Sequence, residues 1–247
     1  MGRLNRLWGP YSCAVNYMQI TYQLVWAVVL AMLLGWLWLR FLRACEAANQ
    51  ADWGGRWLNR LDGLNRLFCR HFHRLHYTPV PLPPQGGALV ASNHVSGLDP
   101  LLLIAAARRP LRFIIAQEEY QRFGLNWLYR AIGCIPVERD RQPELALRQA
   151  LRALQKGEVV AIFPHGRIHL DSDPPRKLKG GVASLAQLTG SPVYPVRLEG
   201  IRGQGHVFKA VVQRSHARLT AYPALFCTDY EACLTELAGI LEGRSRL

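Results

Sequence analysis

The stretch L-V-A-S-N-H-V-S-G-L-D-P-L-L-L, residues 89–103, decides the fold, because an apolar run leads through a polar turn into a second apolar run. The first run predicts a short buried strand, S-N-H-V-S-G predicts a loop, and Asp99-Pro100 followed by leucines predicts the start of a helix. The loop thereby delivers a histidine, His94, and an aspartate, Asp99, to the end of a strand.

This His/Asp pair has two interpretations. If the turn folds back, the Asp99 carboxylate can hydrogen-bond one imidazole nitrogen of His94, and the other nitrogen is free to take a proton from a substrate hydroxyl. Such a pair is a general-base dyad. Alternatively, Asp99 is a helix N-cap, Pro100 occupies the first helical position, and His94 is an ordinary loop residue. Spacing alone favours the helix cap.

Downstream of this stretch, short apolar runs alternate with helical patterns. Residues 206–226 resemble further strand material, and residues 229–242 a closing helix. The alternation predicts an α/β fold with a mixed, largely parallel sheet flanked by helices, in which loops at strand ends carry the site. The other predicted strands are 111–116, 134–137, 158–164 and 193–199, and the other predicted helices are 143–156 and 181–189.

Upstream, no residue from Gly9 through Leu39 carries a formal charge, and residues 24–39 are apolar apart from one glycine. This composition predicts an N-terminal membrane-anchoring helical segment that spans or enters the bilayer. A cleaved signal peptide is the alternative, but the apolar part starts late and no small-residue cleavage pattern follows it. More arginines follow the segment than precede it, so a spanning helix would place the main domain on the cytoplasmic side of the cytoplasmic (inner) membrane.

Apolar residues recur at helical spacing between Trp57 and Leu75, and arginines fall largely between them. We interpret this segment as a basic amphipathic helix, which either lies among lipid headgroups or packs on the domain. Prolines and glycines end it, so we divide the chain into an anchor with its basic helix, residues 1–84, and an α/β domain, residues 85–247. The nearby histidines 71, 73 and 76 cannot share one helical face, so we predict no metal site.

The charge of the chain is one-sided, with 30 Lys and Arg against 17 Asp and Glu and a formal net charge of +13. Anionic partners are therefore expected: nucleic acid, acidic lipid headgroups, phosphorylated substrates or an acidic carrier protein. The chain has no helix-turn-helix, zinc-finger or RRM-like signature, which disfavours nucleic acid. The six cysteines contain no C-x-x-C pair, so we expect reduced thiols in a cytosolic setting. They are Cys13, Cys45, Cys69, Cys134, Cys227 and Cys233.

Several motifs in chain order resemble those of the glycerolipid acyltransferase family, which includes the lysophosphatidate acyltransferases. The family's third motif, F-P-E-G-x-R, appears with His165 in place of the glutamate and with Arg167 one residue early. The resemblance covers about residues 88–200. Its matches are N-H-x-x-x-x-D at 93–99, G-C-I-P-V-E-R at 133–139, F-P-H-G-R at 163–167, L-K-G at 178–180 and P-V-Y-P-V at 192–196.

The resemblance implies a membrane-bound 1-acylglycerol-3-phosphate O-acyltransferase. Such an enzyme moves a fatty acyl chain from acyl carrier protein or coenzyme A, as co-substrate, to the free hydroxyl of a lysophospholipid in the membrane, and needs no other cofactor. For 1-acyl-glycerol-3-phosphate, the product is phosphatidic acid. His94 would be the general base and Asp99 its orienting carboxylate. The residues expected to bind the anionic acceptor are Arg139, His165, Gly166, Arg167 and Lys179.

Two features qualify this reading of the chemistry. Only one residue separates Ser96 from His94, and the chain has no G-x-S-x-G elbow, so direct transfer without an acyl-enzyme is expected. An imidazole at position 165 would donate a hydrogen bond or carry positive charge, or it would be a structural histidine without a substrate contact. The departure leaves another acceptor open, such as a lyso-ornithine lipid. From a different class, a non-catalytic membrane protein that binds anionic lipid is the alternative.

Overall fold

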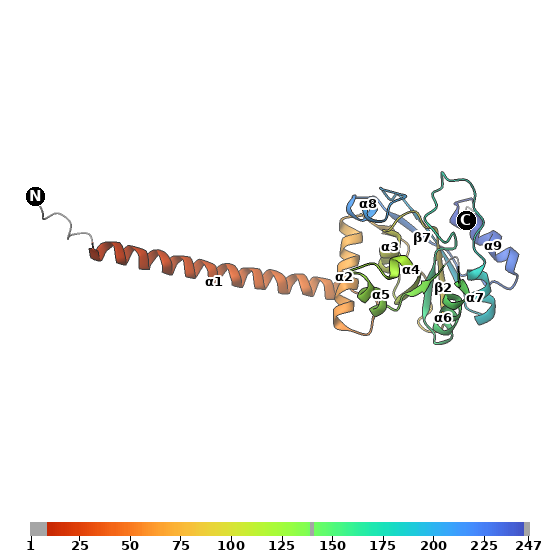
Figure 1. Ribbon diagram of the computed structural model, residues 1–247, viewed down its shortest axis with the longest axis horizontal. Coiled ribbons are helices and arrows are strands. Elements are labelled where there is room, and N and C mark those ends of the chain that lie inside the picture. Colours follow the sequence, from red (N-terminus) through yellow and green to blue (C-terminus); the bar gives the residue numbers. More distant parts are fainter. Residues whose placement is uncertain (1–8, 139–140, 245–247) are drawn as a thin grey trace, which may run out of the picture. The chain divides into compact units, whose positions relative to one another are not determined.

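A computed structural model describes the backbone of residues 9–138 and 141–244, and the side chains from residue 18 onward within these ranges (Figure 1). Contacts within the chain divide it into two compact units, with the boundary between Ala47 and Ala48. The first unit is helical. The second unit contains the sheet and every residue of the predicted site that the structure describes.

The described part of the first unit is the helix α1, Gly9–Ala48, up to Ala47. Within it, Met18–Ala48 is long and apolar enough to cross a membrane, judged by length and composition alone. The apolar side chains of this span are exposed, including those of Trp26, Trp36 and Trp38. A long helix that leaves its apolar side chains exposed is consistent with the predicted anchoring segment.

Within the described residues, seven strands form one sheet in the order β1-β7-β6-β2-β5-β3-β4. Neighbouring strands pair in parallel except β6 and β7, which are antiparallel. This confirms the predicted mixed, largely parallel sheet. The strands are β1 His76–Tyr77, β2 Ala88–Ser92, β3 Leu111–Ala116, β4 Ile135–Val137, β5 Val159–Ile162, β6 Val193–Glu199 and β7 Arg218–Ala221.

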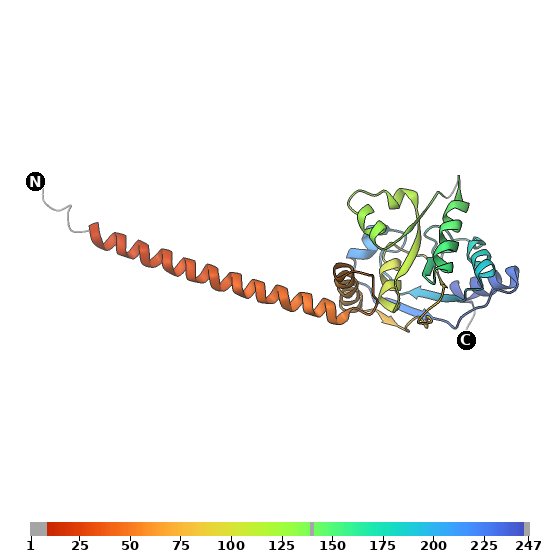
Figure 2. The ribbon, with the colours of Figure 1, turned by 90° about the horizontal axis from the view of Figure 1, so that it is seen from below.

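Helices cover both faces of the sheet, which explains why the central strands read as continuous apolar runs. Successive side chains of β2 point to opposite faces, so Ala88 and Val90 join one core while Leu89 and Ala91 join the other. The first core lies under α2 Arg56–His71, α3 Asp99–Ala106 and α8 Val207–Val212, together with α4 Gln117–Tyr120 and α5 Asn126–Ala131. The second lies under α6 Pro143–Gln155, α7 Gly181–Thr189 and α9 Tyr230–Leu241 (Figures 1 and 2).

One predicted element is wrong. Residues 206–226 are not continuous strand material, because Val207–Val212 forms the short helix α8 and only Arg218–Ala221, β7, pairs in the sheet. The valines of α8 favour strand as single residues, but such preferences are weak against packing. Ala210 is fully buried, and it fixes this turn of helix on the first core.

The helix α2 packs on the α/β unit, which resolves the two possibilities left open for it. Its packed side combines a buried ion pair with apolar contacts. Arg66 pairs with Asp62 at 2.6 Å and donates hydrogen bonds to the carbonyl oxygens of Ala105 and Ala107 at 2.8 and 2.6 Å. Phe68 and Cys69 join the first core, whereas Trp57 is exposed. The compact unit therefore begins at Ala48, and not after residue 84 where we had placed the boundary.

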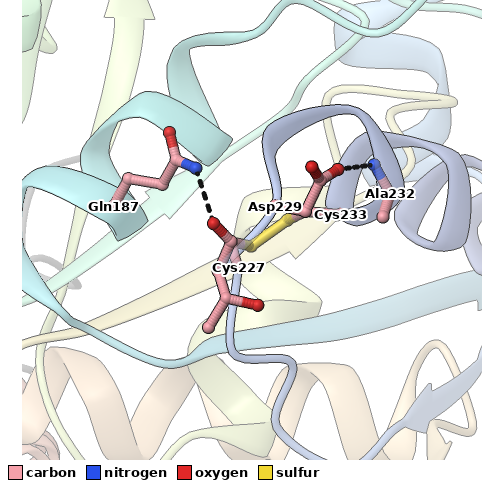
Figure 3. The surroundings of a disulfide bond; sticks show 6 residues. Gln187, Cys227, Asp229, Ala232 and Cys233 are labelled. Atoms are coloured by element: carbon pink, nitrogen blue, oxygen red, sulfur yellow. Dashed lines mark hydrogen bonds between the residues drawn. A yellow bond between two sulfur atoms is a disulfide. The ribbon is translucent and has the colours of Figure 1, made fainter.

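The expectation that all six cysteines are thiols is wrong for one pair. Cys227 and Cys233 form a disulfide, with their Cα atoms 5.1 Å apart (Figure 3). Asp229 caps α9 by accepting a hydrogen bond from the amide of Ala232 at 2.7 Å, and this turn brings the two cysteines together. Among the described cysteines, Cys45, Cys69 and Cys134 are buried and form no disulfide with one another or with the Cys227–Cys233 pair.

Candidate active site

Two loops meet at one edge of the sheet because of strand register. The strands β2 and β5 are parallel neighbours, and Ala91 pairs with Ile162, so the residues that follow each strand emerge at the same edge. The carboxyl ends of parallel strands are where such sheets carry their sites. The ring of His94, after β2, stacks on the ring of Phe163, after β5, with centroids 4.1 Å apart.

The dyad hydrogen bond is present: His94 Nδ1 lies 2.8 Å from Asp99 Oδ2. The helix cap is Leu98, and Asp99 is the first residue of α3, so the simple cap interpretation is wrong. The buried carboxylate turns back into the loop instead. It accepts hydrogen bonds from the amides of Val95 and Ser96 at 2.6 and 2.9 Å, and from the Ser96 hydroxyl at 2.7 Å.

These bonds assign the proton on His94. An ionised carboxylate only accepts hydrogen bonds, so the proton between the two groups belongs to Nδ1 of His94. Nε2 then carries a lone pair, and the side chain is 18% exposed, which leaves it open to a substrate. Ser96 Oγ is occupied as a donor to Asp99 and as an acceptor from the amide of Leu98, which agrees with its exclusion as a nucleophile.

Asn93 anchors the dyad loop, a role that the sequence analysis missed. Its side-chain amide donates to the carbonyl oxygen of Leu198 at 2.9 Å, and its side-chain oxygen accepts from the amide of Leu198 at 2.8 Å. This reciprocal pair continues the pairing of β2 with β6 for one more residue. The only sequence signal was its place beside His94, since the partner lies far along the chain.

The loop after β5 folds over the dyad. The amide of His169 donates to the carbonyl oxygen of His94 at 2.7 Å, and the amide of Lys179 donates to that of Pro164 at 2.8 Å. Gly166 has φ of +75°, and a Cβ there would lie 2.7 Å from Cε of Lys179. Glycine therefore lets the lysine side chain cross this turn.

The structure thus brings most of the predicted site together. Gly166 and Lys179 are in contact, and the Lys179 side chain is exposed, as is that of Arg167 on the same loop. Arg139 lies outside the described residues. Arg167 and Lys179 thus add exposed positive charge to the loop whose Phe163 stacks on His94, and such charges suit an anionic group.

His165 is buried, and its ring stacks on that of His169 with centroids 4.6 Å apart. Neither of its ring nitrogens has a hydrogen-bond partner among the described residues. Burial, followed by the nearby His169, Arg176 and His94, lowers the pKa of His165 to about 4. The imidazole is therefore neutral near pH 7, which excludes a positive charge and leaves either a hydrogen bond to the substrate or a structural role without a substrate contact.

This pKa makes stability depend on pH. Between about pH 6.5 and about pH 4, the unfolded chain protonates His165 while the native chain does not, so the free energy of unfolding falls as the pH is lowered. The loss approaches about 3 kcal/mol at the lower limit. His165→Gln should flatten the fall in thermal midpoint over this range in detergent. His71→Gln, at an exposed position on α2, should leave it unchanged; equal slopes in all three proteins would refute the assignment.

Comparison with known proteins agrees with this geometry. Residues 71–199 match the family described as Acyltransferase. The chain belongs to this acyltransferase family. The match contains the dyad loop, the loop after β5 and Lys179.

Curated relatives of this chain carry lipid-related names. One is the 1-acyl-sn-glycerol-3-phosphate acyltransferase of Bacillus subtilis, 25% identical over 54% of this chain and 66% of the relative. Another is a probable 1-acyl-sn-glycerol-3-phosphate acyltransferase of Mycoplasma genitalium, 33% identical over 60% of this chain and 54% of the relative. A third is the N-acylphosphatidylethanolamine synthase of Arabidopsis thaliana, 31% identical over 47% of this chain and 44% of the relative. The chain thus covers between 44% and 66% of the length of these relatives.

A solved structure shares the fold. The crystal structure of the 1-acyl-sn-glycerophosphate (LPA) acyltransferase from Thermotoga maritima matches with a TM-score of 0.61, covering 79% of this chain and 84% of that one at 19% identity. Among the described residues of the chain, no three His, Cys, Asp or Glu side chains gather as metal ligands would. Independence of metals and of other cofactors stays a prediction.

Proposed function

We propose that the protein transfers a fatty acyl chain from a thioester to the free hydroxyl of a lysophospholipid. The observation that carries this proposal is the 2.8 Å bond from His94 Nδ1 to the buried Asp99, because it leaves Nε2 as an available base. The names of the relatives favour 1-acyl-glycerol-3-phosphate as the acceptor, and phosphatidic acid as the product.

In the proposed mechanism, Nε2 of His94 takes the hydroxyl proton as the acceptor oxygen attacks the thioester carbonyl. Asp99 stabilises the imidazolium that forms. When the tetrahedral intermediate collapses, the carbon–sulfur bond breaks and the imidazolium returns its proton to the leaving thiolate. Transfer is direct, because the Ser96 hydroxyl is already committed to Asp99.

The donor is the thioester of acyl carrier protein or of coenzyme A. Both carriers are anionic, which suits a chain of net charge +13. The acceptor's phosphate would be bound by Arg167 and Lys179, and by Arg139 where the family places its second-motif arginine. Gly166 would let Lys179 approach the loop, and neutral His165 would form a hydrogen bond with a substrate oxygen.

If Arg167 binds the acceptor, Arg167→Ala should raise the KM for the acceptor about tenfold or more while the KM for the donor changes little. The reason is the loss of a charge-assisted hydrogen bond to phosphate. Steady-state rates with each substrate varied in turn measure both constants. Arg148→Ala, at an exposed position on α6, serves as the matched control. A proportionate rise in both constants would mean that Arg167 serves the fold.

The acceptor is tested with purified protein in detergent and a labelled acyl donor. The panel contains 1-acyl-glycerol-3-phosphate, other lysophospholipids, lyso-ornithine lipid and phosphatidylethanolamine. Lyso-ornithine lipid belongs there because His165 replaces the family's glutamate, and phosphatidylethanolamine because of the Arabidopsis relative's name. Labelled phosphatidic acid is the expected product. Labelling of another acceptor alone would correct the substrate, and binding of anionic lipid without any product would favour the non-catalytic alternative.

We further propose that α1 anchors the protein in the cytoplasmic membrane with the α/β unit on the cytoplasmic side. The arginines that follow the span support this side. The disulfide between Cys227 and Cys233 argues the other way, since disulfides are rare in the cytosol. We give more weight to the arginines, because they flank the span itself. Protease added to sealed inverted vesicles should cleave the α/β unit, and protection from cleavage would reverse the assignment.

A further inference from the structure

Exposed apolar side chains gather on α8 and on the loop between α4 and α5. Phe123 in that loop is 100% exposed, and Phe208 and Val212 on α8 are 60% and 74% exposed. The guanidinium carbon of Arg122 lies 4.9 Å from the centre of the Phe208 ring, which places the loop against the helix. We name Phe123, Val207, Phe208 and Val212 the α8 patch.

The helix α8 is fixed in this orientation by its inner side. Ala210 is fully buried in the first core, and the carbonyl oxygen of Val211 lies 3.1 Å from Nε2 of His73. Phe208 and Val212 are four residues apart, so they share the opposite side of the helix. Phe208 and Val212 are therefore exposed because the contacts of Ala210 and Val211 hold the other side of α8 against the first core.

The surroundings of the patch are basic. From Gly200 to Thr228 the sequence contains no Asp or Glu, while Lys209 and Arg214 are exposed on either side of Val212. On the loop side, Arg122 pairs with Glu119 at 2.6 Å, so most of the unbalanced charge comes from α8 and its flanks. Two copies of such a surface would repel each other, whereas anionic headgroups would neutralise it. Apolar side chains among basic ones are typical of surfaces that enter the headgroup layer.

The patch adjoins the dyad loop. The amide of Gly205 donates to the carbonyl oxygen of Val95 at 2.9 Å, which ties the segment before α8 to the residue after His94. A Cβ on Gly97 would lie only 2.4 Å from the carbonyl oxygen of Val207. The start of α8 therefore rests directly on the turn that holds Asp99.

We propose that the α8 patch docks on the surface of a phospholipid bilayer that contains anionic headgroups, as a membrane contact additional to α1. Phe123, Phe208 and Val212 enter the interface, while Lys209 and Arg214 bind headgroup phosphates. Docking brings the dyad loop to the lipid surface. The contact itself does not depend on the proposed reaction.

Depth measurements test the contact in the full chain. A nitroxide is attached to Val212→Cys in a Cys13→Ser background, and the protein is reconstituted in vesicles of phosphatidylcholine with phosphatidylglycerol. Relaxation by oxygen should exceed relaxation by a water-soluble nickel complex at this site. The matched control is Leu188→Cys on α7, the helix that covers the second core; this side chain is 71% exposed and should remain in water. Phe123→Ser with Phe208→Ser should move the Val212 label into water.

Two results would overturn the proposal. One is a Val212 label as accessible to the nickel complex as the Leu188 label. The other is a spectrum of the Val212 label that shows spin–spin broadening, and keeps it when the protein is diluted with excess lipid. Such broadening would show that a second copy of the chain, and not the bilayer, covers the α8 patch.

A separate assay, which rests on the proposed function, compares acceptors. The Phe123→Ser, Phe208→Ser variant should be about tenfold less active than the wild type on an acceptor embedded in vesicles. On a monomeric short-chain acceptor its activity should be close to that of the wild type. If the wild type is inactive on both acceptors, the proposed function is contradicted, but the depth measured with the Val212 label still tests the membrane contact.

Discussion

His94→Ala should reduce the turnover number for acyl transfer by about 10²–10⁴-fold while leaving the thermal midpoint nearly unchanged. The imidazole supplies the base for the attacking hydroxyl, and removal of a positioned general base costs a rate of this order. The side chain is partly exposed, and its only side-chain hydrogen bond that we describe is the one to Asp99, so the fold does not depend on it. Product formation from labelled donor, under saturating acceptor, measures the loss.

Asp99→Asn is the informative companion to His94→Ala. The carboxylate accepts four hydrogen bonds: Oδ2 accepts those from His94 Nδ1 and from the amides of Val95 and Ser96, and Oδ1 accepts the one from the Ser96 hydroxyl. An asparagine with its oxygen in the Oδ2 position keeps the first three bonds, but it turns its NH2 group toward Ser96 Oγ and carries no charge. We expect a rate loss of similar order, because a neutral amide does not stabilise the imidazolium as the carboxylate does. If a folded His94→Ala protein keeps its rate, the base is another group and the mechanism fails.

Arg66→Ala should lower the free energy of unfolding by about 3–5 kcal/mol, since it leaves a buried carboxylate without its counter-charge. The Asp62 side chain is 1% exposed, and the carbonyl oxygens of Ala105 and Ala107 also lose their donor. The thermal midpoint in detergent should fall by about 10 °C for a unit of this size. Acyl transfer at low temperature should persist, because the pair is no part of the proposed site.

Two further variants separate the buried charge from a general effect of losing an arginine. Arg70→Ala, at an exposed position one turn along the same helix, should change the free energy of unfolding by less than about 0.5 kcal/mol. Arg66→Met with Asp62→Leu removes both charges and should recover part of the lost stability. Equal losses for Arg66→Ala and Arg70→Ala would show that the buried pair is not what holds α2.

The parts of the fold that the sequence predicts well are those whose pattern is set by burial on the sheet. The predicted strands 111–116 and 193–199 coincide with β3 and β6, and the predicted helix 181–189 coincides with α7. In each case apolar residues repeat with the period of the element, and both cores are deep enough to enforce it. The His94–Asp99 bond was predictable for a related reason, because both partners lie in one short turn.

The features that escaped prediction depend on partners far apart in the chain or on local packing. Asn93 pairs with Leu198, and nothing near either residue indicates the other. The buried ion pair of α2 depends on carbonyl groups at the end of α3, and the pattern of apolar residues along the helix carries no sign of it. The Cys227–Cys233 disulfide follows from the capped turn that starts α9, which no cysteine spacing rule describes.

The pairing of Ala91 with Ile162 has a consequence for how this chain can change over generations. Because strand register, and not the intervening segments, aligns the ends of β2 and β5, the connection from α3 through α6 can gain or lose residues at its exposed turns without shifting His94 against Phe163. Insertions and deletions are thus tolerated between the motifs and not within them. The order of the motifs is therefore a more durable mark of ancestry in such a chain than the distances between them.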